Sequence, residues 1–387
     1  MNQSETPPRI TLKDIATTWW PLAASWLLMA LELPAISAVM ARLSRPKINL
    51  AAYGGIVFPI ALIIEAPVIM LLAASTALSK DWASYKKIRK FMMLSGGVLT
   101  GLHALVAFTP LYFVVTEQLI GSPQEIVQPA RIGLMIMLPW TWSIAYRRFN
   151  QGVLIRFDHS QTVGIGTLVR LSADSIVLLI GYLIQDIPGI IVGTSAVAAG
   201  VISEALYVGF RVQPVISQQL KPAQEVTPRL TRSTFFEFYI PLALTSLMTL
   251  LAQPLVSAAL SRMPRAIDSL AVWPVISGLL FIFRSPGMAY NEVVVALLDK
   301  PRSTRNLSRF TALLTISMTS LLLLMALTPL SELWLIHISA LDPDLARLAE
   351  RALWFRLLVP GANTLQSWYQ GAILHDKKTR GIPEAVG

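Results

Sequence analysis

The sequence predicts an all-α, polytopic membrane protein that consists of two pseudo-symmetric helical lobes. Hydrophobic residues make up 54% of the 387 residues and charged residues only 14%, whereas soluble domains contain about 25% charged residues. Apolar runs of about 20 residues, long enough to cross a bilayer, recur along the chain, and the mean hydropathy is +0.58. The third observation is that one of these runs occurs twice.

The duplicated run is PLAASWLLMALELPAISAVMARL at 21–43, which aligns without a gap to PLALTSLMTLLAQPLVSAALSRM at 241–263. The copies share two prolines, a Ser-Ala pair and an arginine in register, which a common hydrophobic alphabet rarely reproduces. A second match joins 50–67 to 270–286 once one residue is dropped. The chain therefore contains a duplicated membrane unit.

Spans of about 20 apolar residues predict ten membrane helices. We expect them near 17–41, 50–78, 91–114, 131–155, 163–184, 188–211, 235–261, 270–298, 308–329 and 347–374. The first repeat then has six helices and the second has four, which is a 6 + 6 fold whose last two helices are missing. The repeat register predicts these two helices after Gly387.

A polar segment with three prolines lies between the two repeats. It predicts an N-lobe of six transmembrane helices at 1–211, a cytoplasmic linker at 212–234 and a C-lobe of four transmembrane helices at 235–387.

Basic residues are concentrated in the loops that follow even-numbered spans, while 115–130, 185–187 and 330–346 contain no Lys or Arg. The positive-inside rule therefore predicts a cytoplasmic N-terminus in a multi-pass protein of the cell (inner or plasma) membrane. The basic residues that break this pattern on the outer side are Arg42, Arg45, Lys47, Arg262 and Arg265. They are either tolerated exceptions or two basic rims that attract or release an anion.

Glu32 is a carboxylate in the middle of the first expected span. Charged groups inside a span are costly, and by default they face a cavity or a partner. Pro34 follows two residues later and frees a backbone carbonyl. Glu32 either binds a coupling proton or Na⁺ or makes a structural bond to a neighbouring helix. Its repeat equivalent is Ala252, so this charge occurs only in the N-lobe.

Glu65 and Arg284 are the most informative pair of charges. Each lies two residues before the proline of the second helix of its repeat, in EAP and RSP respectively. Pseudo-twofold symmetry would place these opposite charges at matching depths of the two lobes. They could form a salt bridge that closes one face of a transporter. Alternatively, Arg284 could hold an anionic substrate while Glu65 titrates or binds a cation.

Further polar residues lie inside the expected spans. Arg170 and Asp174 are four residues apart, so they share a helix face and either neutralise each other or relay protons. Arg147 and its polar neighbours form either a cytoplasmic entry for an anion or a solvated helix end. The candidate substrate-binding residues are Arg284, Glu65, Glu32, Asn291, Glu292, Arg147, Asn150 and Gln151, and the candidate coupling residues are Glu32, Glu65, Asp174 and Glu204.

The sequence shows no sign of an enzyme. It contains no cysteine, which excludes thiolate metal sites and iron–sulfur clusters, and it has no Walker A loop, GxSxG motif or metal-binding histidine spacing. We therefore expect no catalytic residue, no metal and no cofactor. The net charge of +10 is explained by loop placement rather than by nucleic-acid binding. The expected partners are the lipid bilayer, a small-molecule solute and a coupling ion, in a monomeric protein.

These motifs resemble the MOP superfamily of exporters, in which two six-helix lobes of the MATE type alternate access. Within it, AAYG at 51–54 with the proline helix that follows, and PLAL…QPLVSAALSR at 241–262, are similar to repeats of the progressive ankylosis (ANK) family. The ANK resemblance implies small anions such as pyrophosphate, nucleotides or citrate. The MATE resemblance implies cationic drugs exchanged for H⁺ or Na⁺.

The sequence therefore predicts a secondary active transporter that exports a small organic or phosphate-type anion by alternating access between its lobes. Two alternatives remain, namely H⁺- or Na⁺-coupled MATE-type efflux of cationic drugs and a flippase for lipid-linked precursors.

Overall fold

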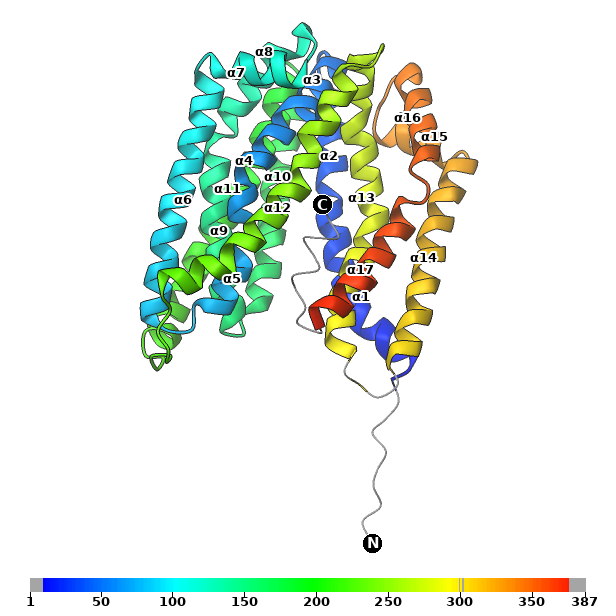
Figure 1. The fold of residues 1–387 in the computed structure, drawn as a ribbon. Helices are drawn as coiled ribbons and strands as arrows, with labels where there is room; N and C mark the ends of the chain where they lie inside the picture. Colours follow the sequence, from blue (N-terminus) through cyan, green and yellow to red (C-terminus); the bar gives the residue numbers. More distant parts are fainter. Residues whose placement is uncertain (1–9, 299, 301–302, 376–387) are drawn as a thin grey trace. The chain divides into compact units, whose positions relative to one another are not determined.

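The computed structural model describes residues 10–298, 300 and 303–375 of the chain. Within these residues the secondary structure is entirely helical, with no β-strand (Figure 1). The first half contains α1 (Leu12–Ala30), α2 (Glu32–Met40), α3 (Pro46–Ala52), α4 (Phe58–Ile69), α5 (Leu71–Leu78), α6 (Trp82–Phe108), α7 (Leu111–Phe113), α8 (Gln124–Ile136), α9 (Leu138–Arg156), α10 (Ser160–Ile184) and α11 (Gly189–Val215). The second half contains α12 (Arg232–Ser261), α13 (Ala266–Leu297), α14 (Ser303–Leu327), α15 (Leu330–Glu332), α16 (Pro343–Phe355) and α17 (Val359–His375). Four π-helical turns join some of them: η1 (Tyr53–Val57), η2 (Val114–Ile120), η3 (Ile216–Leu220) and η4 (Leu333–Ile338).

Each of the ten expected spans coincides with a helical run. Among the described residues, eight runs are long and apolar enough to cross a bilayer: Leu12–Met40, Pro46–Leu78, Trp82–Phe108, Ser160–Ile184, Gly189–Leu220, Arg232–Ser261, Ala266–Leu297 and Ser303–Leu327. The spans expected at 131–155 and 347–374 are each divided into two helices, at Met137 and at 356–358. These two runs carry more charged and polar residues, so their membrane crossing stays a prediction.

The first span shows how proline is accommodated. The helix is interrupted at Leu31, whose backbone N–H bonds to the carbonyl of Leu28. Helix α2 then begins at Glu32, so Pro34 lies in its first turn. The first backbone N–H groups of a helix have no intrahelical partner, so proline costs little at this position. The apolar run is therefore two helices placed end to end.

The segment between the repeats is more helical than its sequence indicated. The helical run of α11 continues through η3 to Leu220 despite Pro214, so residues 212–220 of the expected linker are helical. The irregular part is confined to 221–231. Proline removes a single intrahelical hydrogen bond, and a π-helical turn can accommodate the loss of that bond. Most of 115–130 and 330–346, expected as loops, is also helical.

Asp81 holds the irregular linker against the start of α6. Its carboxylate caps the helix by accepting the backbone N–H of Ser84 at 2.7 Å, and it also accepts the N–H of Val226 at 2.9 Å. Burial alone would raise the pKa of Asp81, but these backbone hydrogen bonds outweigh it and lower the pKa below its usual value. The ionised carboxylate is therefore the form that stabilises the fold.

Replacing Asp81 by alanine should lower the free energy of unfolding by about 0.5–2 kcal/mol at neutral pH, the range measured for helix caps. Because the folded-state pKa is lowered, this contribution is present above the unfolded pKa of about 3.9 and is lost as the pH falls through the folded pKa. Thermal unfolding of both proteins across this range should therefore show converging stabilities below about pH 4. A constant difference at all pH values would contradict this role.

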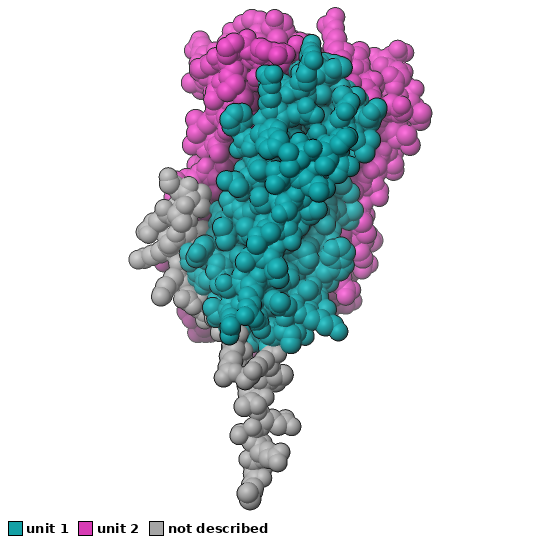
Figure 2. Space-filling view, turned by 90° about the vertical axis from the view of Figure 1, so that its right-hand side faces the viewer, with its two compact units in different colours: residues 1–34, 275–385, 387 teal, residues 35–274, 386 magenta. Residues whose placement is uncertain are grey.

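The described residues form two compact units, coloured separately in Figure 2. Unit 1 contains residues 10–34 and 275–375, and unit 2 contains residues 35–274. Helix α1, the first of repeat one, thus belongs to the unit that holds most of repeat two, and α12 belongs to the other unit. The lobes expected from the repeats, 1–211 and 235–387, are divided differently from these two units, and that division stays a prediction.

Two equivalent hydrogen bonds explain this exchange of first helices. In unit 1, the indole N–H of Trp19 on α1 donates to the carbonyl of Pro286 on α13 at 2.8 Å. In unit 2, the hydroxyl of Tyr239 on α12 donates to the carbonyl of Pro67 on α4. Trp19 and Tyr239 occupy equivalent positions in the repeat alignment, and so do the two prolines. The first helix of each repeat therefore packs on the second helix of the other.

The hydrogen bond of Tyr239 can be tested by Tyr239→Phe. Tyr239 is buried, so loss of its hydroxyl should lower stability by about 0.5–1.5 kcal/mol, the usual net value of one hydrogen bond. Thermal unfolding in detergent measures the change. Tyr182→Phe is the control, because Tyr182 is 42% exposed and should show no change. Equal melting temperatures for both variants would contradict the contact.

Candidate functional site

Unit 2 contains a buried charge cluster that four helices assemble. Its members are Glu65 on α4, Arg147, Arg148 and Gln151 on α9, Arg170 and Asp174 on α10, and Glu204 on α11. These side chains come from distant parts of the sequence, so the fold and not local sequence creates the cluster.

Glu204 forms a closer ion pair than Asp174 does in this cluster. One carboxylate oxygen pairs with the guanidinium of Arg147, and the other accepts the amide N–H of Gln151 at 2.8 Å. The three residues are 1%, 4% and 2% exposed, respectively. Arg147 and Gln151 are four residues apart, which places both on the side of α9 that meets α11. The alternative of a solvated helix end is therefore wrong for these residues, because the inner part of α9 is covered by α11.

Asp174 meets α11 one turn away from Glu204. Its Oδ2 lies 4.0 Å from Nε of Arg170, as the i, i+4 spacing predicted. On α11, Gly200 lies directly against this carboxylate, and a Cβ atom there would overlap it. Glycine is needed at this position because only a residue without a side chain permits so close an approach. Nothing in the sequence pattern had marked Gly200.

Glu65 is buried, being 4% exposed, and its Oε2 has no hydrogen-bond partner. The charged groups that act on it are the guanidinium groups of Arg148, Arg147 and Arg170. Arg148 is partly buried and, among the described residues, forms neither a hydrogen bond nor an ion pair. The cluster thus contains two engaged carboxylates, on Glu204 and Asp174, and a third that is surrounded by positive charge without a direct contact.

Asn150 is also buried but bonds within its own helix. Its side-chain N–H donates to the backbone carbonyl of Tyr146 at 2.9 Å. One of the two amide N–H groups of Asn150 is therefore engaged within α9.

Unit 1 contains Arg284 on α13, the repeat equivalent of Glu65. Arg284 is partly buried, its Nε is buried without a hydrogen-bond partner, and it forms no ion pair with any residue that the structure describes. The helix turn around Arg284 supplies its own partner for the one carbonyl that a proline leaves without its usual N–H donor. Pro286 cannot donate to the carbonyl of Ile282, four residues earlier, and the hydroxyl of Ser285 donates to that carbonyl at 2.9 Å instead.

The remaining sequence candidates lie elsewhere in unit 1. Asn291 is partly buried and Glu292 is exposed, both on α13 beyond Arg284. Glu32 is partly buried at the start of α2, directly after the interruption of the first span. In the described part of the chain, no group of three or more His, Asp or Glu side chains could hold a metal ion.

Comparison with known proteins identifies the fold. No protein-family model and no curated protein matches the sequence. Among solved structures, an inward-facing multidrug resistance MATE family transporter of the MOP superfamily aligns over 96% of this chain and 88% of its own, with TM-score 0.69 and 12% identity. An outward-facing transporter of that family aligns over 95% and 84%, with TM-score 0.57 and 15% identity. A Vibrio cholerae MATE transporter in a bent form aligns over 94% and 86%, with TM-score 0.57 and 16% identity. The chain therefore has the all-helical fold of MATE transporters, while the closer relation to the ANK family is not confirmed.

Proposed function

We propose that this chain is a secondary transporter that alternates access between two sides of a membrane and exports a small organic or phosphate-type anion. The fold shared with MATE transporters supports transport. One observation supports the anion. The repeat-equivalent residues Glu65 and Arg284 carry opposite charges at the same place in their repeats, and neither forms a hydrogen bond or ion pair with the described residues.

Arg284 is the residue we assign to the substrate. A guanidinium group held in a span without a partner is costly, and it is stabilised when an anion enters. Its planar donors match carboxylate and phosphate oxygens in pairs. No hydrogen bond or ion pair of Arg284 with the described residues then has to break when the anion binds.

Glu65 is the residue we assign to coupling. Asp174 and Glu204 are already engaged with arginines, so changing their charge would disrupt the bundle. Glu65 has no such contact to lose. Because Arg147, Arg148 and Arg170 act on it, its charge state alters the electrostatic balance of the whole cluster, and a proton or cation bound there can favour one conformation over the other.

A second candidate function is H⁺- or Na⁺-coupled efflux of cationic drugs. The structures with this fold include multidrug resistance transporters, and Glu32 together with Glu65 could carry the coupling charge. Pump activity that disappears in Glu32→Gln, with no anion flux, would favour this candidate. The remaining alternative is a flippase for lipid-linked precursors. In that case the transported anion would be attached to a lipid.

The proposed coupling is tested by Glu65→Gln in proteoliposomes. Radiolabelled citrate or pyrophosphate is the transported probe, with flux measured with and without an imposed pH or Na⁺ gradient. The variant should lose the gradient-driven flux by at least about tenfold while downhill exchange of the anion persists, because an uncharged side chain cannot respond to the ion. Gradient-driven flux that equals wild type would contradict the role of Glu65. Arg347→Ala, which affects an exposed pair, is the control.

A further inference from the structure

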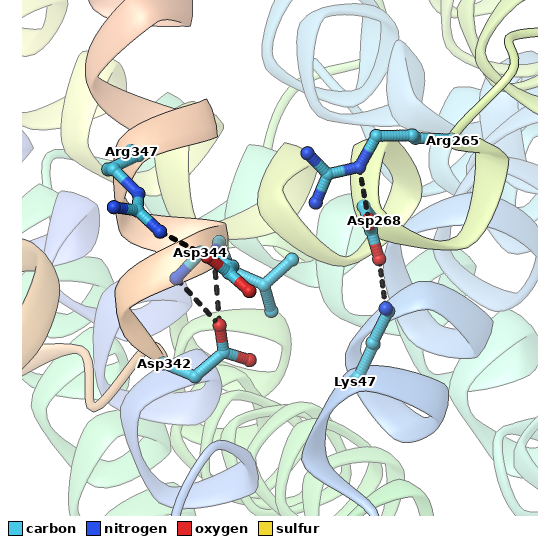
Figure 3. Close-up of polar contacts among 7 residues, drawn as sticks. Lys47, Arg265, Asp268, Asp342, Asp344 and Arg347 are labelled. Carbon is cyan, nitrogen blue, oxygen red and sulfur yellow. Dashed lines mark hydrogen bonds and ion pairs between the residues drawn. The ribbon is translucent and has the colours of Figure 1, made fainter.

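The start of α3 and the start of α13 are joined by an ion-pair triad inside unit 2. Asp268 on α13 pairs with Lys47 of α3 through one carboxylate oxygen and with Nε of Arg265 at 2.6 Å through the other (Figure 3). Asp268 is only 7% exposed, while the two cations are about half exposed. Two of the basic residues that broke the charge pattern on the expected outer side therefore share one carboxylate of the second repeat.

Further along the same two helical runs, repeat-equivalent residues touch each other. Gly54 in η1 and Pro274 in α13 occupy the same position in their respective repeats. A Cβ atom on Gly54 would lie 2.6 Å from Cδ and 3.1 Å from Cβ of Pro274, so only glycine permits this approach. Equivalent positions meet only at the pseudo-twofold axis. In two parallel repeats this axis runs along the membrane normal, and the solute path lies at the repeat interface.

Arg262 adds a third contact at the same end of the molecule. From the C-terminal end of α12 it donates to the backbone carbonyls of Ile120 at 2.9 Å and Leu119 at 3.2 Å, at the end of η2. These carbonyls are left without helical partners where the helix ends, and a cation is favourable there. Arg262 thereby ties repeat two to repeat one.

We propose that these contacts form a latch that closes the expected outer end of the transport path, with Asp268 as its central residue. The latch joins α3, η1 and η2 of repeat one to α12 and α13 of repeat two. A path that opens to one side must be closed on the other, so the latch has to break in each transport cycle. The proposal rests on the transport function proposed above.

The ion-pair triad is suited to reversible opening. Its cations are half exposed, so water can solvate them when the pairs break, and each pair contributes little on its own. Asp268 is the single residue that both pairs share. Its loss leaves Lys47 and Arg265 close together without a counter-charge, which favours separation of the two helix ends.

The first test uses a disulfide. The chain contains no cysteine, so Gly54→Cys with Pro274→Cys introduces one defined pair. The two Cβ atoms would lie 3.1 Å apart, slightly less than the about 3.5–4.5 Å found in disulfides, so the two helices need to separate only slightly for the bond to form. The oxidised double variant should lose citrate or pyrophosphate flux by more than tenfold and regain it on reduction, while Pro274→Cys alone is unaffected by oxidation. Failure of the disulfide to form, or undiminished flux with the disulfide formed, would overturn the latch.

The second test does not depend on transport. Reaction of a membrane-impermeant thiol reagent with Pro274→Cys reports how often this end opens. Adding Asp268→Asn should speed labelling by about fivefold, as expected for the loss of two partly exposed ion pairs. Adding Arg347→Ala should have no effect, because the Asp344–Arg347 pair (Figure 3) lies within α16 of unit 1. Equal labelling with and without Asp268 would overturn the latch. Faster labelling in a protein that moves no solute would leave the latch standing and refute the transport function.

Discussion

Replacing Glu204 by leucine is expected to destabilise the protein by about 3–5 kcal/mol, the cost of leaving a buried charge without its partner. Glu204 is 1% exposed and binds both Arg147 and Gln151. Without the carboxylate, the Arg147 guanidinium remains in a bundle interior where water cannot solvate it. Thermal unfolding in detergent and the yield of folded protein would measure the effect.

A double variant separates this cost from a general defect. Combining Glu204→Leu with Arg147→Met removes both charges, and replacing a buried pair by apolar residues of similar volume is often neutral. The double variant should therefore be more stable than Glu204→Leu alone. Arg347→Ala, which breaks a pair whose side chains are 70% and 72% exposed, should cost less than about 1 kcal/mol. A double variant no better than the single would show that the pair is not the cause.

Replacing Arg284 by alanine is expected to reduce anion flux by about ten- to a hundredfold. Hydrogen bonds to a charged group contribute about 1.5–3 kcal/mol, and each 1.4 kcal/mol is a factor of about ten. Since Arg284 has no hydrogen bond or ion pair with the described residues, its loss should leave the melting temperature unchanged. Flux and melting temperature therefore need to be measured on the same preparations.

Arg284→Lys provides the matched control for charge alone. Lysine keeps the positive charge but loses the paired donors, so its flux should lie between wild type and alanine. If Arg284→Ala transported citrate and pyrophosphate at the wild-type rate, Arg284 would not bind the substrate. If it unfolded instead, Arg284 would be a structural residue.

The helical architecture was predictable because its signals are local. Apolar runs of bilayer length predicted ten helical spans, each of which coincides with a helical run of the described residues, and the matched prolines and arginines predicted the repeat. The i, i+4 spacing also predicted the approach of Arg170 to Asp174. Linker boundaries were less accurate, since Pro214 suggested an end to α11 where the helix continues to Leu220.

The site contacts were not predictable because they join distant parts of the chain. No local pattern connects Arg147 on α9 with Glu204 on α11, or Gly200 with Asp174 across two helices. The repeat alignment pairs Trp19 with Tyr239 and Pro286 with Pro67, but it does not indicate that the first helix of each repeat contacts the second helix of the other. Likewise, no local pattern indicated that Lys47 pairs with Asp268. Whether the basic residues on the expected outer side are tolerated exceptions or attract an anion stays a prediction.

Anion transport by this chain, as proposed above, can be measured directly. The most direct measurement compares two solutes in proteoliposomes of the purified wild-type chain, labelled citrate or pyrophosphate and a labelled organic cation, under the same imposed H⁺ or Na⁺ gradient. We expect saturable, gradient-dependent movement of the anion, and no movement of the cation above that in protein-free liposomes. Gradient-driven movement of the cation without movement of either anion would contradict it.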